Sequence, residues 1–368
     1  MTAATNSIRY RSLRDLDWPL ILITLILCGL GILQIYSATH GTKFEDSWWK
    51  QIVFVAVGLG LMWMFAVIDY HSLLGQVPMM YAASIVGLIA VLLVGVRIFG
   101  AKRWIALGGF NFQVSEFVKL MLVLLVARFL SEIRSDSLEL PDFLKLAGLV
   151  GVPTLLVMKQ PDLGTSLTFF PILASGMFLA GLRWKYWLCL GLLALVVVPA
   201  GWYALKDYQR ARLVSFVNPD ADPKGSGYQQ AQSRIAIGSG GLWGKGVTQG
   251  TQTQLRFLPV PHTDFIMSAF AEEHGFVGVV VVLTLYFVLL MQIIQNAQTA
   301  PDRAGMFICM GVCALFLFHI LVNVAMVVGR MPVTGIPLPL VSAGGSNTLS
   351  TFVMLGLVNN VRLRRFVN

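Results

Sequence analysis

The segment from Pro259 to Ile266 contains the carboxylate best placed to do chemistry. Its two prolines stop any preceding helix, and Thr263 or Asp264 can start the next one. One interpretation makes Asp264 a helix N-cap whose carboxylate accepts backbone N–H bonds. The other makes Asp264 a general base beside a cavity. The two interpretations are compatible.

Two ionisable side chains lie near the start of another apolar run. Glu116 and Lys119 are three positions apart, so on a helix they share one face and can pair. Ionisable groups at membrane depth are costly and by default indicate a functional site. The alternative is an ion pair that only holds helices together, and the spacing does not choose between the two.

Three loops carry further polar side chains with two interpretations each. Arg103 lies beside Trp104, so this pair can bind a phosphate or anchor the loop at a membrane interface. Asp162 stands between a proline and a Leu-Gly pair, which is typical of a turn. Arg210 can pair with a pyrophosphate or with an acidic neighbour, and the sequence leaves both open.

The elements that hold these residues are predicted to cross a membrane. Of the 368 residues, 56% are hydrophobic and only 12% are charged, whereas soluble domains have about 25% charged residues. So little charge cannot cover a globule in water, which excludes a soluble enzyme and a disordered chain. Apolar runs long enough to span a bilayer, about 20 residues, recur along the chain. We therefore expect an all-α polytopic membrane protein.

About ten transmembrane helices are predicted, and Gly and Ser inside them favour close packing in lipid. The expected spans are Pro19–Tyr36, Gln51–Ile68, Pro78–Phe99, Phe112–Phe129, Leu146–Met158, Leu167–Leu182, Trp187–Leu205, Gly275–Ile294, Met306–Val328 and Leu349–Val361. The stretch from Phe265 to Ile294 is too long for one upright span, so Gly275 and Gly278 predict a short surface helix before the eighth span.

The connecting loops differ between the two sides of the membrane. Basic residues are more frequent on the side of the termini, which predicts that both termini are cytoplasmic. The large loop over 206–264, between spans seven and eight, contains apolar side chains and is expected to fold over the outer surface. Residues 1–368 are thus predicted to form a single integral membrane domain whose functional site lies on the outer face.

The net charge of +9 does not indicate a nucleic-acid partner. The basic residues are scattered over many short loops and form no single patch. We expect them to orient the helices and to contact anionic membrane lipids. Nucleic acid is therefore excluded as a partner.

The loop motifs resemble those of the SEDS family (shape, elongation, division and sporulation), and within it the RodA branch rather than the FtsW branch. The matching stretches are Gly100 to Trp104, Gln160 to Ser166, Tyr228 to Gly241, Gly250 to Pro259, His262 to Ile266 and Pro337 to Ser346. The resemblance covers nearly the whole chain. Val260-Pro261 and Ala343 depart from the usual residues, and neither departure touches Asp264.

This resemblance implies a peptidoglycan glycosyltransferase in the bacterial cytoplasmic (inner) membrane, with a GT-C-like arrangement of helices. It implies polymerisation of lipid II on the extracytoplasmic face during cell elongation. The implied partners are a class B penicillin-binding protein, which is a transpeptidase, and the elongation machinery. A divalent cation, Mg²⁺ or Mn²⁺, is the implied cofactor, and its ligands are not identified.

The implied chemistry assigns a role to each candidate residue. Attack by a sugar hydroxyl needs a base, and we assign Asp264. The leaving pyrophosphate needs positive charge, for which Arg103, Lys119 and Arg210 are the candidates. The remaining expected substrate-binding residues are Trp104, Glu116, Asp162 and Gln254. Two alternatives stay open: a lipid II flippase, and a non-catalytic scaffold of the cell-wall elongation machinery.

Overall fold

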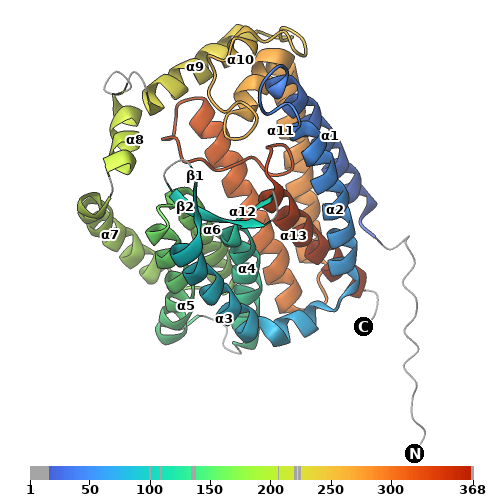
Figure 1. Cartoon of the computed structure of the whole chain (residues 1–368). Helices are drawn as coiled ribbons and strands as arrows, with labels where there is room; N and C mark the ends of the chain where they lie inside the picture. Colours follow the sequence, from blue (N-terminus) through green and yellow to red (C-terminus); the bar gives the residue numbers. More distant parts are fainter. Residues whose placement is uncertain are drawn as a thin grey trace, which may run out of the picture.

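The computed structural model describes residues 16–98, 101–107, 110–133, 138–205, 207–218, 222 and 225–365 (Figure 1). Its helices are α1 (Trp18–Thr39), α2 (Ser47–Val67), α3 (Tyr70–Val94), α4 (Val114–Glu132), α5 (Leu140–Lys159), α6 (Leu163–Leu179), α7 (Trp184–Gly201), η2 (Trp202–Ala204), α8 (Asp207–Val217), α9 (Ser226–Ser239), α10 (Thr251–Gln254), α11 (Ile266–Gln298), α12 (Arg303–Val327) and α13 (Gly345–Arg364). Its short strands are β1 (Val96–Ile98), β2 (Ala101–Leu107) and β3 (Phe110–Phe112).

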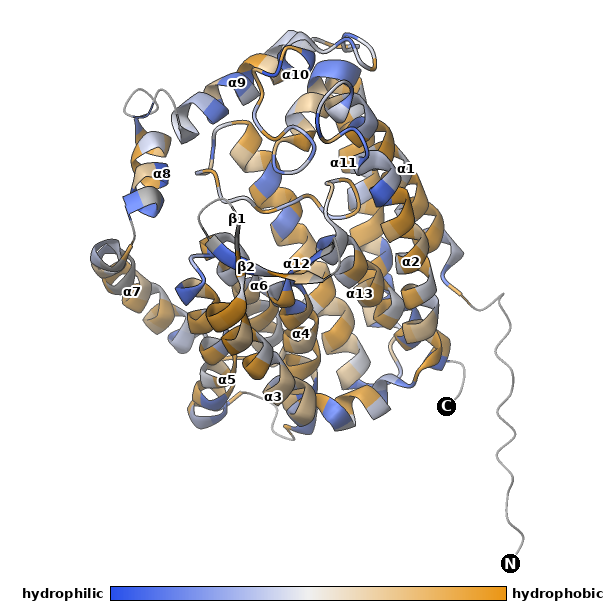
Figure 2. Ribbon diagram, viewed as in Figure 1, coloured by the Kyte–Doolittle hydropathy of each residue, from blue (hydrophilic) through white to orange (hydrophobic). Residues whose placement is uncertain are grey.

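The all-α membrane class is confirmed, and each of the ten predicted spans coincides with a helix. Within the described ranges, seven helices are long and apolar enough to cross a membrane: α1, α2, α3, α5, α7, α11 and α12. Of the other three, α6 is shorter, while α4 and α13 carry more polar side chains. Figure 2 shows the apolar colouring along the bundle and more polar segments at its ends.

Of the ten helices that match the predicted spans, the two least apolar, α13 and α4, lie inside the bundle rather than against lipid. Nearly every residue of α13 from Ser346 to Leu363 is buried, and most of α4 is buried as well. Two glycines allow α2 and α13 to approach closely. A Cβ on Gly356 would lie 2.6 Å from the Met62 carbonyl oxygen, and one on Gly58 would lie 2.5 Å from the Phe352 ring. Small residues at such contacts are a common device of helix packing in lipid.

Helix α11 is two helices joined at a break, as the glycines predicted. Gly275 has φ 68° and ψ −168°, outside the helical region, and a Cβ there would lie 2.3 Å from the Gly244 nitrogen. A side chain is therefore excluded at Gly275 by both space and backbone conformation.

The loop 241–246 packs into this break and satisfies its backbone groups. Phe276 and Val277 donate their N–H groups to the Gly241 and Leu242 carbonyls at 2.9 and 3.1 Å. In the other direction, the Lys245 and Gly246 N–H groups donate to the carbonyls of Glu272 and Glu273 at 3.0 Å each. The large loop is thus attached to the interior of α11, because a broken helix leaves such groups without internal partners.

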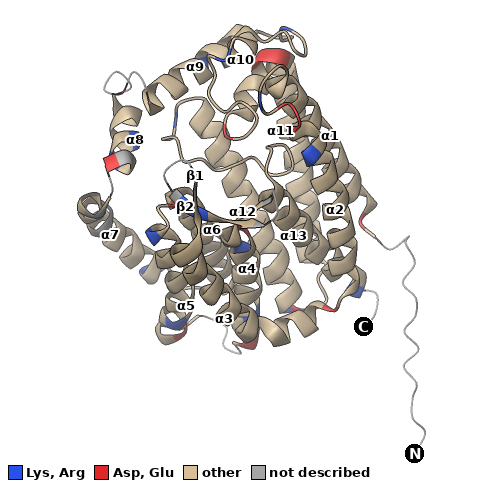
Figure 3. Ribbon diagram, viewed as in Figure 1, with Lys and Arg blue, Asp and Glu red and all other residues tan. Residues whose placement is uncertain are grey.

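Two loops on one side of the bundle have more structure than expected. The antiparallel sheet β1–β2–β3 occupies the loop predicted after Phe99, and in it Val96 pairs with Trp104 and Ile105 with Phe112. Its first strand replaces the predicted end of the third span, because α3 stops at Val94. The large loop over 206–264 contains α8, α9 and α10. In Figure 1 this loop lies at the end of the bundle away from the C-terminus, and Figure 3 shows charged residues concentrated toward the two ends.

Candidate functional site

Asp264 is the last residue but one before α11, and it does not cap that helix. The N-cap position of α11 belongs to Phe265, and no side chain makes a capping hydrogen bond there. The N-cap interpretation of Asp264 is therefore wrong, because the turn over 261–265 starts the helix one residue later. Its carboxylate is left available for another role.

The backbone around Asp264 is held by residues from distant elements. Asn323, buried on α12, donates through Nδ2 to the Asp264 carbonyl at 3.0 Å and to the Ile336 carbonyl at 2.9 Å. The Ser342 hydroxyl donates to the Thr263 carbonyl at 2.7 Å. The loop over residues 329–344 is thereby fastened beside Asp264 and forms one wall of the site.

Gly335 lets this wall approach the carboxylate. A Cβ at Gly335 would lie 3.6 Å from Asp264 Oδ2, and its φ of +73° favours glycine. The backbone, rather than a side chain, therefore borders the carboxylate on this side. A small residue next to a reactive group leaves room for a substrate atom.

The charges around Asp264 oppose one another. Burial raises the pKa of its carboxyl, Arg212 and Arg103 act to lower it, and Asp162 acts to raise it; the net direction is upward. The Asp264 side chain is still partly exposed. A carboxylate with a raised pKa in a partly open position is suited to accept a proton.

Arg103 and Asp162 form an ion pair, and both charges act on the Asp264 carboxylate. Arg103 Nη1 is 3.6 Å from Asp162 Oδ1, and Nη2 donates to the Pro161 carbonyl at 2.6 Å. Asp162 also accepts from the Gln113 side chain at 3.3 Å and from the Thr165 N–H at 3.1 Å. Asp162 is thus the N-cap of α6, so the turn interpretation holds and the residue also orients Arg103.

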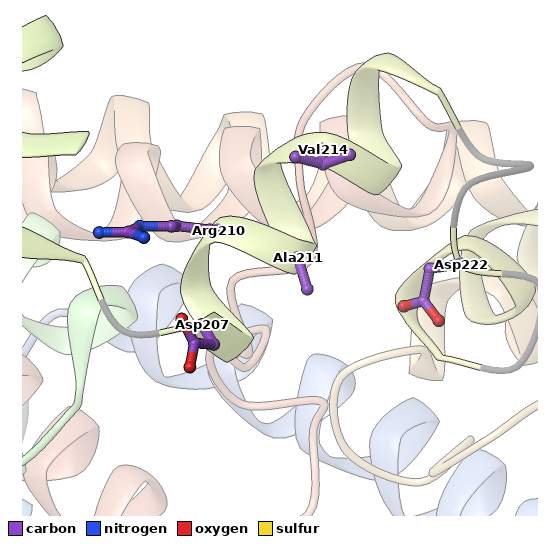
Figure 4. Close-up of a pocket in the computed structure, with 5 residues that line it drawn as sticks. All are labelled: Asp207, Arg210, Ala211, Val214 and Asp222. Carbon is purple, nitrogen blue, oxygen red and sulfur yellow. The ribbon is translucent and has the colours of Figure 1, made fainter. Parts of the chain in front are cut away.

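Arg212 is the second cation at Asp264, and Arg210 is not brought there. Arg212 donates to the Val333 carbonyl at 3.0 Å, on the loop that borders the site. Arg210 donates to the carbonyls of Trp202 and Tyr203, each at 3.0 Å. Arg210 lines a separate cavity of about 420 Å³ with Asp207, Ala211, Val214 and Asp222. Figure 4 shows Arg210 extending away from Asp222, on the other side of α8.

A prediction of a helix over residues 207–217 would have placed these two arginines on different faces of that helix. Positions two apart on a helix differ by about 200° around its axis, so Arg210 and Arg212 cannot face the same site. Residues 206–264 were expected to form a loop, in which no spacing distinguishes Arg212 from Arg210, so Arg212 was not among the predicted site residues.

The Glu116–Lys119 pair forms as predicted and is deeply buried. Lys119 Nζ is 2.6 Å from Glu116 Oε2, and the two side chains are 2% and 5% exposed. Lys119 Nζ also lies 3.5 Å from His319 Nε2 on α12, and Ser350 on α13 donates to Glu116 at 3.5 Å. The pair therefore joins α4, α12 and α13 in the bundle interior.

His319 links this pair to the loop over residues 329–344. Its Nδ1 lies 3.0 Å from the Pro337 carbonyl, which can only accept, so Nδ1 carries the proton and Nε2 accepts from Lys119. Pro337 follows Ile336 in the chain. The Asn323 side-chain amide donates both to the Ile336 carbonyl and to the Asp264 carbonyl. Lys119 is thus connected to the site by contacts through His319 and the loop.

Trp104 and Gln254 lie elsewhere than the carboxylate. Successive side chains of a strand point to opposite faces, so Trp104 on β2 points away from the face that carries Arg103. Gln254 donates to the Ser37 carbonyl at 3.0 Å and fastens α10 to the end of α1. The geometry around Asp264 therefore does not support the expected contacts of Trp104 and Gln254 with substrate.

Glu272 is a structural carboxylate. Its Oε1 accepts from Lys245 and from the Gln252 N–H at 2.9 and 2.8 Å, and its Oε2 accepts from the Thr253 N–H and hydroxyl at 3.1 and 2.9 Å. These bonds fasten α10 to α11 and leave little capacity to accept another proton.

The donor set around Asp264 does not fit a resident divalent cation. Among the described residues, no group of three or more His, Cys, Asp or Glu side chains could hold a metal ion. Asp162, the carboxylate that acts on Asp264, already pairs with Arg103 and accepts hydrogen bonds from Gln113 and the Thr165 N–H. Two guanidinium groups beside the carboxylates act against binding of a further cation. The two arginines instead suit an anionic substrate, and the Asp264 carboxylate suits removal of a proton from it.

A model of the cell cycle protein family of FtsW, RodA and SpoVE matches residues 18–365. The chain belongs to the FtsW/RodA/SpoVE family. The family member MrdB, a peptidoglycan glycosyltransferase of Escherichia coli K12, is 39% identical over 99% of this chain and 98% of its own. The peptidoglycan glycosyltransferase RodA of Treponema pallidum is 33% identical over 97% of this chain and 100% of its own.

Solved structures of the FtsW/RodA/SpoVE family share the fold. A chain of a peptidoglycan synthase complex that coordinates polymerization and crosslinking superposes with a TM-score of 0.84 at 33% identity, over 96% of this chain and 99% of that one. The rod shape determining protein RodA of Thermus thermophilus gives a TM-score of 0.72 at 30% identity, over 95% and 98%. The family relation thus extends over the whole bundle, including the loops that build the site.

Proposed function

We propose that this protein polymerises lipid II into glycan strands, with Asp264 as the general base. It is a multi-pass membrane protein whose relatives are peptidoglycan glycosyltransferases, and it has that activity. Asp264 removes the proton from the 4-hydroxyl of an N-acetylglucosamine. The freed oxygen attacks the anomeric carbon of an N-acetylmuramic acid, and the bond to the pyrophosphate breaks. Undecaprenyl pyrophosphate leaves with the bonding electrons, and the anomeric centre inverts from α to β.

The observation that carries this assignment is the environment of the Asp264 carboxylate. It makes no capping bond, it is partly exposed, and it lies among Arg212, Arg103 and Asp162. The same two arginines can offset the negative charge that develops on the leaving pyrophosphate. Arg212 takes the role that the sequence suggested for Arg210. Lys119 is a positioning residue in this scheme, because among the described residues its buried amine is connected to the site through His319.

The divalent cation belongs in this proposal with the substrate. Mg²⁺ is usually held by one or two carboxylates together with substrate phosphates and water. The pyrophosphate supplies the oxygens that the described residues do not. We therefore assign the cation to the substrate complex.

The proposed active site lies on the extracytoplasmic face, with both termini cytoplasmic. The support is the excess of basic residues on the side of the termini and the attachment of the large loop near Asp264. In a Cys189→Ser background, Gln249→Cys on this loop should react with an impermeant thiol reagent from outside, whereas Lys145→Cys should not. Both side chains are exposed, so the reverse labelling pattern would refute the orientation.

A class B penicillin-binding protein is the proposed partner, since the matched synthase complex couples polymerization to crosslinking. The deciding experiment gives purified protein lipid II, with and without that partner, and resolves glycan product on a gel. A scaffold would form no glycan under either condition. A flippase would move lipid II across vesicle membranes without polymerising it. Glycan that appears with wild type and not with Asp264→Asn supports the proposal.

A further inference from the structure

A cavity of about 280 Å³ opens between α3, α4 and α5, far from Asp264. Its lining residues are Val77, Pro78, Tyr81, Leu125, Arg128, Phe129, Glu132 and Leu149. Most of this wall is apolar, and one cation and one anion complete it. None of these residues takes part in the site around Asp264.

Arg128 is fixed in this wall by the proline of the neighbouring helix. Pro78 has no N–H, so the Leu74 carbonyl lacks its usual helix donor. Arg128 Nη1 supplies the missing bond at 2.7 Å and also donates to the Gly75 carbonyl at 3.2 Å. Its Nε donates to Glu132 at 3.0 Å. The described residues show no hydrogen bond from Nη2, so that end of the guanidinium is available.

The charged and apolar parts of the cavity are ordered along the membrane normal. Arg128 and Glu132 lie at the C-terminal end of α4, roughly 20 Å along the helix from its start beside Gln113. They therefore lie at the membrane surface opposite Asp264. Leu125 is one turn deeper on α4, and Tyr81 and Leu149 lie further along α3 and α5. A charged rim at the surface above an apolar wall matches the orientation of a phospholipid.

The two charges at the rim select among headgroups. Arg128 and Glu132 are 31% and 66% exposed, so both remain open to a ligand while they pair with each other. A phosphate fits the Arg128 guanidinium. An ammonium with N–H donors fits the Glu132 carboxylate, whereas a headgroup with only negative charge is repelled by it.

We propose that this cavity binds phosphatidylethanolamine, with its phosphate on Arg128, its ammonium on Glu132 and part of an acyl chain along Leu125, Phe129 and Leu149. The bound lipid fills the gap between α3, α4 and α5. Phosphatidylglycerol lacks the ammonium, and the choline ammonium of phosphatidylcholine has no N–H to donate. Both bind this cavity more weakly.

The test measures lipid retained by the full-length protein in detergent. Equal amounts of phosphatidylethanolamine, phosphatidylglycerol and phosphatidylcholine with identical acyl chains are added, and native mass spectrometry counts the bound lipid. One phosphatidylethanolamine should be retained in preference to the other two. Glu132→Gln should lower the ratio of phosphatidylethanolamine to phosphatidylglycerol about fivefold, as expected for one exposed charge pair. Because Glu132 is mostly exposed, this variant keeps the fold.

The matched control is Asp142→Asn, which removes one negative charge near the same end of the bundle but outside the cavity. It should leave the ratio unchanged. Leu149→Trp fills the apolar wall and should reduce retention of all three lipids. The proposal is overturned if Glu132→Gln and Asp142→Asn give the same ratio as wild type, or if wild type shows no preference for phosphatidylethanolamine.

Discussion

The exchange Asp264→Asn separates the catalytic role of this carboxylate from any structural one. Asp264 does not cap α11, and its backbone is held by Asn323 through the carbonyl. An asparagine of nearly the same size therefore keeps every backbone contact and loses only the charge and the ability to take a proton. General-base assistance contributes about 10²–10⁴-fold in rate, so glycan synthesis should fall by that factor.

Stability should change in the opposite direction to activity. Burial raises the pKa of Asp264, so the folded state disfavours its ionised form. Above this raised pKa the wild type contains an unfavourable charge that asparagine lacks, and the Asn variant should unfold at a higher temperature at neutral pH. As the pH falls through the raised pKa toward the unfolded value, the carboxyl becomes protonated and this difference should disappear.

The assay combines gel-resolved glycan from lipid II with thermal unfolding of the same preparations. Glu45→Gln, an exposed carboxylate in the loop between α1 and α2, serves as the matched control and should behave as wild type. Near-normal glycan from Asp264→Asn would remove it as the base. Loss of stability at neutral pH would show that the carboxylate, when charged, makes a favourable contact, and would refute the electrostatic reasoning.

Three further predictions concern the surroundings of the base. Arg212 lowers the pKa of Asp264, so Arg212→Gln should move the acid limb of the pH–rate profile to higher pH. An acid limb that stays in place would show that Arg212 does not act on the titrating base. Lys119→Ala leaves Glu116 buried without its ion pair, which should lower the free energy of unfolding by about 3–5 kcal/mol. Exchanging the two residues should restore folding but not activity. An active exchanged protein would reduce the pair to a structural role. Chelation of divalent cations should stop glycan synthesis. The Mg²⁺ concentration that gives the half-maximal rate should fall as the lipid II concentration is raised, because the pyrophosphate binds the cation. A constant Mg²⁺ concentration would indicate a cation site on the protein itself.

Much of this molecule follows from local sequence pattern. Each of the ten predicted apolar runs coincides with a helix, and seven of the described helices are long and apolar enough to cross a membrane. Hydrocarbon selects helices of sufficient length whatever their neighbours are. The three-residue spacing of Glu116 and Lys119 was enough to predict their ion pair, since helix geometry alone places them on one face. The break in α11 was visible at Gly275, because a residue without Cβ adopts the conformation that a break requires.

The composition of the site was decided by tertiary packing. Which segment meets Asp264 depends on contacts between distant parts of the chain, and no local pattern encodes them. Asn323 holds the Asp264 backbone and Gly335 borders its carboxylate, because α12 and the loop over 329–344 pack there. Arg212 replaces Arg210 because residues 207–217 coil into a helix that turns only one of them toward the site. The sequence alone could therefore propose Asp264 as the base, while only the folded bundle showed which cations act on it.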